Sequence, residues 1–319
     1  MTDSAPEIRT TSPRDSAERR PKRLRDLVRR RRATRRRRIR GISAVPTMLT
    51  LGNLVCGFSA IHYAMKPVGP TKLFDWSNLY VAGLLVFLGM FFDAIDGSVA
   101  RLTRSTSNLG AQLDSLADVV SFGVAPAFMM LRLVSYYYGP EGAVTILGPE
   151  ANSVYAKFLW TIAVIYVCCT ALRLARFNAE TPGASEDDHR NFKGLPSPGA
   201  GGTVASLILL HQSLLATQDV GENLAFARLF ALGLPFVTVI CAVAMVSTLR
   251  YAHFANRVLR APRDFAGIVR LVIPIIVGFF FPHIALAVAF TLYALSGPAY
   301  TVWLLTRRNS VVPPPSTPA

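Results

Sequence analysis

The chain has 319 residues, of which 51% are hydrophobic and only 17% are charged, and its formal net charge is +15. Soluble domains average about 45–50% apolar residues, glycine included, and about 25% charged residues. With a mean hydropathy of +0.36, this composition excludes a soluble globular enzyme, a disordered chain and a disulfide scaffold. It indicates an integral membrane protein with a basic tail.

The basic residues are concentrated before the first apolar segment. Residues 1–40 contain sixteen Lys and Arg but five Asp and Glu, so they carry +11 of the net charge. Such a segment cannot bury itself, and we expect a disordered cytoplasmic tail over residues 1–42. Contact with anionic membrane lipids is favoured over nucleic acid, because no folded nucleic-acid-binding motif accompanies the arginines. The Pro-rich residues 309–319 are also expected to be disordered.

Between the tails, residues 43–308 are expected to form an all-α integral membrane domain. A spanning helix needs about 20 mostly apolar residues. This length predicts about eight transmembrane helices, near residues 46–65, 79–99, 109–137, 154–175, 200–215, 226–249, 265–281 and 284–305. Only Pro282 and His283 divide the last two, so six or seven spans remain alternatives.

The distribution of basic residues favours an even number of spans. With the amino terminus inside the cell, 29 of the 34 Lys and Arg residues fall on the cytoplasmic side. The positive-inside rule predicts this asymmetry, and it places both termini in the cytoplasm. We therefore expect a multi-pass protein of the inner membrane.

Four aspartates lie where membrane helices rarely carry charge. Asp93 and Asp96 are three residues apart at the inner end of the second predicted span, and Asp114 and Asp118 are four apart at the start of the third. Each spacing places a pair on one helix face, and the short connection makes the two helices antiparallel neighbours. All four carboxylates can therefore converge near the cytoplasmic surface. Ionisable residues within membrane segments indicate function by default.

Four like charges in a small volume require a neutralising partner. A salt-bridge network with Arg101 and Arg104 is one possibility. A divalent cation is favoured, because hard cations take several oxygen ligands and Mg²⁺ commonly joins carboxylates to a substrate phosphate. Gly97, Ala100 and Gly110 are small, which indicates close helix packing or space for a substrate against the backbone.

The complete pattern is DxxDGxxAR, from Asp93 to Arg101, followed after eight residues by GxxxDxxxD, from Gly110 to Asp118. It resembles in full the signature of the CDP-alcohol phosphatidyltransferase family, and a chance match is far below about one in a million. Four further segments resemble the bacterial members of that family whose acceptor is serine: TLGNLVCGF from Thr50, DSLADVVSFGVAP from Asp114, RLARFN from Arg173 and KGLPSP from Lys193.

The resemblance implies transfer of a phosphatidyl group from CDP-diacylglycerol to L-serine, with release of CMP, at a site that faces the cytoplasm. It also implies a homodimer and two Mg²⁺ or Mn²⁺ ions. The implied metal ligands are Asp93, Asp96, Asp114 and Asp118, with Asp118 also the general base. The implied CDP-diacylglycerol contacts are Gly97, Ala100, Arg101, Ser107, Gly110, Thr47 and Thr50. The candidates for binding serine are Arg176, Asn178, Lys193 and Asn53.

Several alternatives stay open from the sequence alone. Thr47 and Thr50 can instead bond the carbonyl one turn earlier in their own helix. The acceptor could be glycerol 3-phosphate, inositol phosphate or choline. A cation transporter would also carry membrane aspartates, but the sequence has no visible internal repeat and its aspartates lie toward one surface, unlike many transporters.

Overall fold

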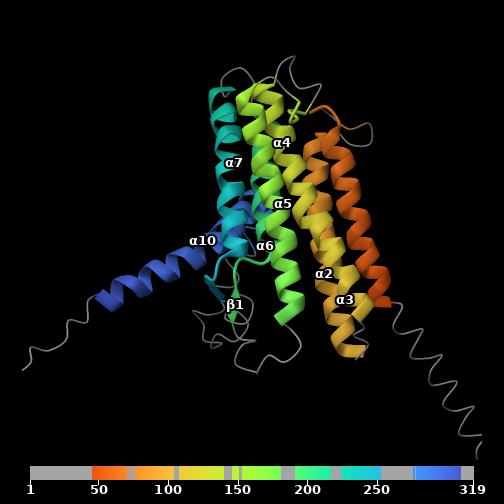
Figure 1. The fold of residues 1–319 in the computed structure, drawn as a ribbon. Coiled ribbons are helices and arrows are strands. Elements are labelled where there is room, and N and C mark those ends of the chain that lie inside the picture. The colour runs from red at the N-terminus through yellow and green to blue at the C-terminus, as the bar shows by residue number, and fades with distance from the viewer. Residues whose placement is uncertain are drawn as a thin grey trace, which may run out of the picture.

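A computed structural model describes residues 45–69, 71, 76–103, 108–139, 146–150, 153–180, 191–216, 224–252, 276 and 278–309. Within these ranges the chain forms a bundle of long helices, seen from the side in Figure 1. The predicted tail over residues 1–42 lies outside the described residues, as does the predicted tail over 309–319 except for Asn309, which ends a helix. Over this part of the chain the fold is helical, as the sequence predicts, apart from one short pair of strands, which the all-α prediction did not include.

The helices run in chain order from the first span, Val45–Met65, to α10. They are α2 (Asn78–Thr103), α3 (Asn108–Asp118), the π-helix η1 (Val119–Val124), α4 (Ala125–Tyr138), α5 (Val154–Glu180), α6 (Ser197–Ala216), α7 (Leu224–Val246) and α10 (Pro282–Asn309). The strands β1 (Asn191–Lys193) and β2 (Arg250–Ala252) pair antiparallel. Because α3, η1 and α4 are continuous, they form one span, Leu109–Tyr138.

Six of the described helices are long and apolar enough to cross a membrane, so the chain is a multi-pass membrane protein. They agree with the predicted spans that begin at residues 46, 79, 109, 154, 226 and 284. The predicted span at 200–215 corresponds to the helix α6 (Ser197–Ala216), which is not one of these six. Most of the predicted span at 265–281 lies outside the described residues. The count of eight therefore stays a prediction.

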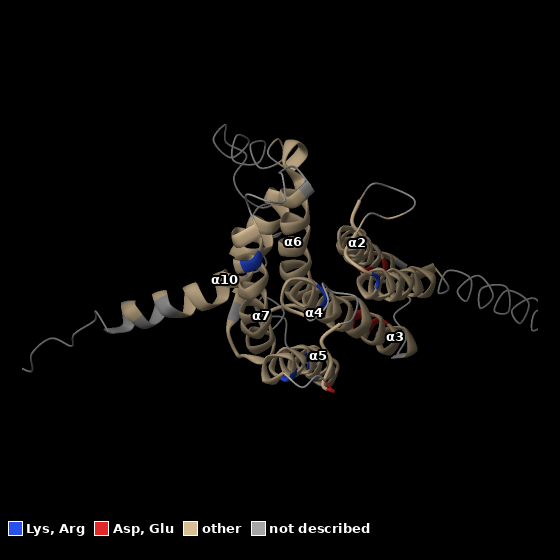
Figure 2. Ribbon diagram, turned by 90° about the horizontal axis from the view of Figure 1, so that it is seen from above, with Lys and Arg blue, Asp and Glu red and all other residues tan. Residues whose placement is uncertain are grey.

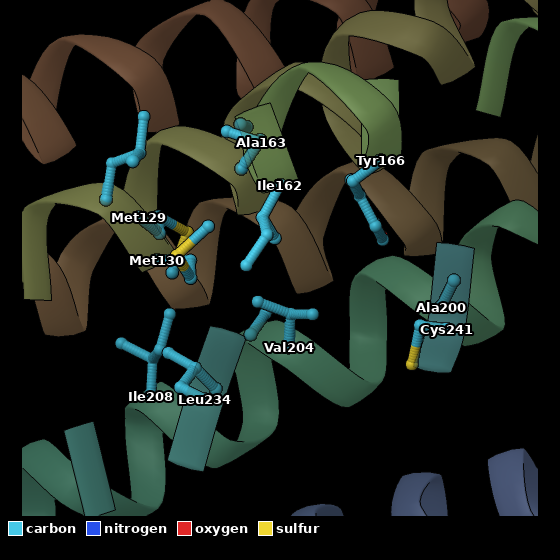
Figure 3. Close-up of a cluster of buried hydrophobic side chains, with 14 of the residues drawn as sticks. Met129, Met130, Ile162, Ala163, Tyr166, Ala200, Val204, Ile208, Leu234 and Cys241 are labelled. Atoms are coloured by element: carbon cyan, nitrogen blue, oxygen red, sulfur yellow. The ribbon is translucent and has the colours of Figure 1, made fainter. Parts of the chain in front are cut away.

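The helix α6 is the central packing element of the bundle. The helices α2, α7 and α10 all pack against it. Its glycines allow close approach, since a Cβ at Gly201 would lie 3.0 Å from the Cα of Phe122 in η1. Farther along α6, Val204 and Ile208 join the buried apolar cluster drawn in Figure 3, together with Met130 of α4. This core holds the helices that carry the polar residues in fixed positions.

A proline accounts for the change from η1 to α4. Pro126 has no N–H, so it cannot donate the helical hydrogen bond to the carbonyl of Phe122. The hydroxyl of Tyr166, on α5, donates to that carbonyl at 3.0 Å instead. The N–H of Ala125 bonds the carbonyl of Val120, five residues earlier, as in a π-helix. Such π-turns are frequent at functional sites, and this one begins directly after Asp118.

The same arrangement recurs in α10. Pro298 lies inside this helix and cannot donate to the carbonyl of Ala294. The hydroxyl of Tyr251, in β2, donates to this carbonyl at 3.1 Å. Burial raises the pKa of Tyr251 to about 12, so the hydroxyl keeps the proton that it donates. Tyr251 also lies opposite Phe192 of β1, and Figure 1 shows β1 at the same end of the bundle as α3.

Candidate active site

Three carboxylates converge where α2 and α3 meet. One oxygen from each of Asp93, Asp114 and Asp118 lies within 4.8 Å of the other two. Asp93 and Asp114 are half-buried, and Asp118 is 7% exposed. Figure 2 shows the acidic positions of α2 and α3 on neighbouring ribbons when the bundle is seen from above. The structure thus brings together three of the four aspartates singled out from the sequence.

Asp96 lies beside this group of three. Its side chain is 5% exposed, and Oδ2 accepts a hydrogen bond from Thr50 Oγ1 at 2.8 Å. The same hydroxyl lies 3.0 Å from the carbonyl of Pro46, one turn earlier in the first span. A hydroxyl has a single proton, and a bond to a carboxylate is stronger than one to a neutral carbonyl. Thr50 therefore joins the first span to Asp96, while the bond within its own helix competes for the same proton.

Asn53 is fully buried in the first span and contacts Asp118. Its Nδ2 donates to Asp118 Oδ1 at 3.2 Å, and its backbone carbonyl accepts a bond from Ser121 Oγ at 2.9 Å. Gly89 of α2 leaves room for the amide, because a Cβ there would lie 2.8 Å from Asn53 Oδ1. Asp118 thus accepts the hydrogen bond from Asn53 Nδ2, whereas the buried Asn53 Oδ1 has no hydrogen-bond partner among the described residues.

The donor set suits a hard divalent cation. Carboxylate oxygens are the ligands that Mg²⁺ and Mn²⁺ prefer. Asp114 Oδ1 is buried without a hydrogen-bond partner among the described residues, and a buried charge needs a partner or a metal. Three neighbouring carboxylates also repel one another unless a cation lies among them. Of the alternative partners, the side chain of Arg101 and all of Arg104 lie outside the described part of the chain.

The other residues predicted to contact CDP-diacylglycerol fall into two groups. Three are half-buried on the first span, α2 and α3, the helices that carry the acidic group: Thr47, Gly97 and Gly110. For three others the side chain or the whole residue lies outside the description: Ala100, Arg101 and Ser107.

The predicted serine contacts occupy two different elements besides the first span. Asn178 is exposed near the end of α5, and its Nδ2 donates to Ser115 Oγ of α3 at 2.8 Å. Arg176, also on α5, is half-buried. Lys193 lies in β1 opposite Arg250 of β2, and its side chain is not described. Asn178 therefore connects α5 to the helix that carries Asp114.

Arg173 is a site residue that the sequence analysis did not single out. It lies one turn before Arg176 on α5, and its guanidinium interacts electrostatically with Asp118 and Asp93. Its Nη1 donates to Ser197 Oγ of α6 at 2.8 Å, whereas its buried Nε has no hydrogen-bond partner in the described chain. A signal was available, because an arginine within a predicted span is costly and indicates function.

Comparison with known proteins gives a consistent result. The sequence profile of the CDP-alcohol phosphatidyltransferase family matches residues 43–234. A curated CDP-diacylglycerol–serine O-phosphatidyltransferase of Helicobacter pylori is 31% identical over 209 residues, which cover 66% of this chain and 72% of the relative. The protein of that name from Bacillus subtilis is 32% identical over 171 residues, 54% of this chain and 78% of the relative. The one from Methanocaldococcus jannaschii is 27% identical over 220 residues, 69% and 79% respectively.

Proposed function

This chain belongs to the CDP-alcohol phosphatidyltransferase family, and from that premise we propose that it transfers the phosphatidyl group of CDP-diacylglycerol to L-serine. The products are phosphatidylserine and CMP. The observation that carries the proposal is the convergence of Asp93, Asp114 and Asp118, three acids of the family signature, at one point between α2 and α3. The choice of serine is supported by the names of the relatives from three organisms.

The proposed reaction makes one bond to phosphorus and breaks another. The hydroxyl oxygen of serine attacks the phosphorus that carries diacylglycerol, and the bond from that phosphorus to CMP breaks. The electron pair of this bond leaves with CMP, and the hydroxyl proton passes to a base on the protein. Catalysis of phosphoryl transfer depends mainly on positioning and on neutralising charge.

We assign the base to Asp118. Its Oδ1 accepts the hydrogen bond from Asn53, so Oδ2 remains to accept the serine proton. The hydroxyl of Ser121 in turn bonds the backbone of Asn53, which holds the amide in place. The first span and η1 together orient the carboxylate before the substrate arrives. Such orientation lowers the entropic cost of reaching the reactive geometry.

Asp93, Asp114 and Asp118 would hold a divalent cation, Mg²⁺ or Mn²⁺, and Asp96 would contribute to a second. When bound, these ions supply positive charge that neutralises the diphosphate of the substrate and the leaving CMP. The protein contributes the position of the oxygens, since Thr50 fixes Asp96 and Asn53 fixes Asp118.

Further residues are proposed to bind the two substrates. Arg101 would pair with a phosphate of CDP-diacylglycerol, and the small side chains of α2 and α3 would admit the nucleotide to the backbone. The remaining proposed contacts to this substrate are Thr47, Thr50, Gly97, Ala100, Ser107 and Gly110. For serine they are Arg176, Asn178, Lys193 and Asn53.

We also propose that the site faces the cytoplasm from the inner membrane, with eight spans, both termini inside and two copies of the chain in a dimer. The charge asymmetry supports this orientation, because it leaves only five of the 34 Lys and Arg residues outside. The basic tail over residues 1–42 would then contact anionic lipids, and residues 43–308 would form the catalytic domain.

The test is an assay of CMP release by the purified full-length protein in detergent, with CDP-diacylglycerol and Mg²⁺ or Mn²⁺. L-serine, glycerol 3-phosphate, inositol phosphate and choline are offered separately. We expect CMP and phosphatidylserine with serine alone. Release with glycerol 3-phosphate but not with serine would contradict the acceptor. Release with none of the four would contradict the enzymatic function.

A further inference from the structure

The carboxyl-terminal helix α10 lies beyond residues 43–234, which match the family profile, yet it reaches the candidate site. Tyr293 of α10 interacts electrostatically with Arg173. Its ring also packs against α6, because a Cβ at Gly199 would lie 2.9 Å from it. Gly199 is two residues after Ser197, the hydrogen-bond acceptor of Arg173. Arg173, Ser197 and Tyr293 therefore form one cluster from α5, α6 and α10, called here the arginine cluster.

The position of Tyr293 is fixed by the strand pair. Tyr251 of β2 donates to the carbonyl of Ala294, the next residue of α10, and its ring centre lies 5.9 Å from that of Tyr293. The connection from β1 to α6 is held to the segment before β2, since the N–H of Gly194 bonds Leu249 at 2.8 Å. Gly194 has a φ of 86°, which favours glycine. Contacts to the strand pair therefore hold both α10, which carries Tyr293, and the start of α6, which carries Ser197, in place before any ligand binds.

Arg173 has a buried hydrogen-bond donor, Nε–H, that no group in the described part of the chain accepts. A guanidinium carries five N–H donors in a planar fork that matches a carboxylate. Ser197 takes one donor of Nη1, and the buried Nε–H has no acceptor among the described residues. The guanidinium interacts with Asp118 and Asp93, but no salt bridge joins it to either within the described chain. The positive charge of the guanidinium and its planar N–H donors therefore remain available to bind an anion beside Asp93, Asp114 and Asp118.

We propose that Arg173 binds the carboxylate of the amino-acid acceptor, with Ser197 orienting the guanidinium and Tyr293 forming the adjoining wall. This inference rests on the proposed function, and it assigns the selection of serine as the acceptor to the guanidinium of Arg173. In serine a single carbon, Cα, lies between the hydroxyl-bearing Cβ and the carboxylate carbon. A residue near Asp118 can therefore hold the carboxylate while the hydroxyl faces the base. A site built to bond a charged group discriminates strongly against analogues that lack it.

A second role for Arg173 is a counter-ion that reduces repulsion among the aspartates. The two roles predict different kinetics. A counter-ion would act on metal binding and on turnover with every acceptor, whereas a carboxylate-binding group acts on the KM for serine. Serinol separates them further, because it keeps the amine and the hydroxyl of serine but lacks the carboxylate.

The experiment measures CMP release by the full-length protein with serine and with serinol, over a range of Mn²⁺ concentrations. Arg173→Gln should raise the KM for serine about 15- to 150-fold, because a charge-assisted bond is lost. Activity with serinol and the Mn²⁺ concentration for half-maximal activity should stay within about threefold. Arg173→Lys should recover part of the KM, since it keeps the charge but not the fork. Tyr293→Ala removes the ring that forms the wall, and it should raise the KM for serine by about 3- to 10-fold.

Lys157→Gln is the matched control, because Lys157 is an exposed cation on the same helix. It should behave as the unsubstituted protein. If both arginine variants lose activity equally with the two acceptors, or need much more Mn²⁺, Arg173 is a counter-ion and the proposal is wrong. If the unsubstituted protein releases no CMP with any acceptor, the proposed function fails instead. The two failures are thus distinguishable.

Discussion

The two sides of the candidate site are built in different ways. On the acidic side, Asp93, Asp114 and Asp118 come from two consecutive helices joined by a short connection. On the basic side, Arg173 and Tyr293 come from helices that are more than a hundred residues apart in the chain. The acidic side can be recognised from spacing within one segment, whereas the basic side exists only after tertiary packing. We assign the reaction to the first and the choice of acceptor to the second.

The largest effect is expected on the acidic side, from Asp118→Asn. An amide cannot accept the serine proton, so turnover should fall by at least about a thousandfold. Binding of CDP-diacylglycerol, measured by equilibrium dialysis with the labelled lipid, should change little. The exposed Glu150 provides the control, and Glu150→Gln should leave turnover unchanged. Loss of lipid binding in Asp118→Asn would make Asp118 mainly a metal ligand.

The acidic side should also differ from the basic side in its response to metal. A chelator should abolish CMP release, and added Mg²⁺ or Mn²⁺ should restore it. Asp114→Asn should raise the metal concentration for half-maximal activity by about 10- to 100-fold or more, because a ligand is lost. Arg173→Gln, on the basic side, should leave the metal concentration for half-maximal activity unchanged. An unchanged metal requirement in Asp114→Asn would remove this distinction.

A smaller effect is expected from changing Gly89, which leaves room for Asn53, the hydrogen-bond donor to Asp118. Gly89→Ala would place a Cβ 2.8 Å from Asn53 Oδ1, so the amide must move away from Asp118. We expect kcat to fall by about tenfold with little change in the KM for serine. Gly233→Ala is the matched control, because a Cβ at this exposed glycine of α7 would meet nothing within 4 Å. Equal activity of the two variants would contradict a positioning role for Asn53.

Two tyrosine hydroxyls, each bonded to the carbonyl that a helix proline cannot reach, test the acidic and the basic side separately. Tyr166→Phe leaves the carbonyl of Phe122 without its donor next to the acidic side, and Tyr251→Phe does the same to Ala294 on the basic side. Each should lower stability by about 1–2 kcal/mol, seen as a lower Tm of the purified protein. Tyr166→Phe should mainly lower kcat, and Tyr251→Phe should mainly raise the KM for serine. The exposed Tyr300, changed to Phe, should alter neither.

The smallest effect is expected outside both sides. Deletion of residues 1–40 removes sixteen basic residues but no predicted ligand of metal or substrate. CMP release in detergent should remain measurable at close to the rate of the full chain. Binding to vesicles that contain anionic lipid should weaken. An inactive truncated protein would make the tail part of the site.

Local spacing explains why so much of the acidic side was predictable. The i, i+3 and i, i+4 intervals fix which carboxylates share a helix face, and a short loop brings the second helix alongside. The hydropathy windows likewise placed the six apolar spans, because each covers about the thickness of a membrane. The partner of Asn53 was not predictable, since contact with Asp118 depends on how the first span packs against Gly89.

Contacts that depend on distant segments could not be read from the sequence. Arg173 appeared there only as the first residue of the RLARFN segment, and only the packing of α5 against α6 joins it to Ser197. The π-helix after Asp118 was also missed. The carbonyl of Phe122 in this π-helix accepts a hydrogen bond from Tyr166, which lies 44 residues later in the chain. No local sequence pattern indicates that contact. The roles of the predicted site residues stay predictions, and the side chains of four of them lie outside the described part of the chain: Ala100, Arg101, Ser107 and Lys193.

The central claim is that carboxylates from α2 and α3 bind divalent cations at one point. The most direct test is electron paramagnetic resonance of Mn²⁺ bound to the full-length protein, with CDP-diacylglycerol present. We predict saturable binding to the unsubstituted protein and its loss in the double variant Asp93→Asn, Asp114→Asn, with the fold retained by circular dichroism. The same Mn²⁺ affinity in both proteins would contradict the account.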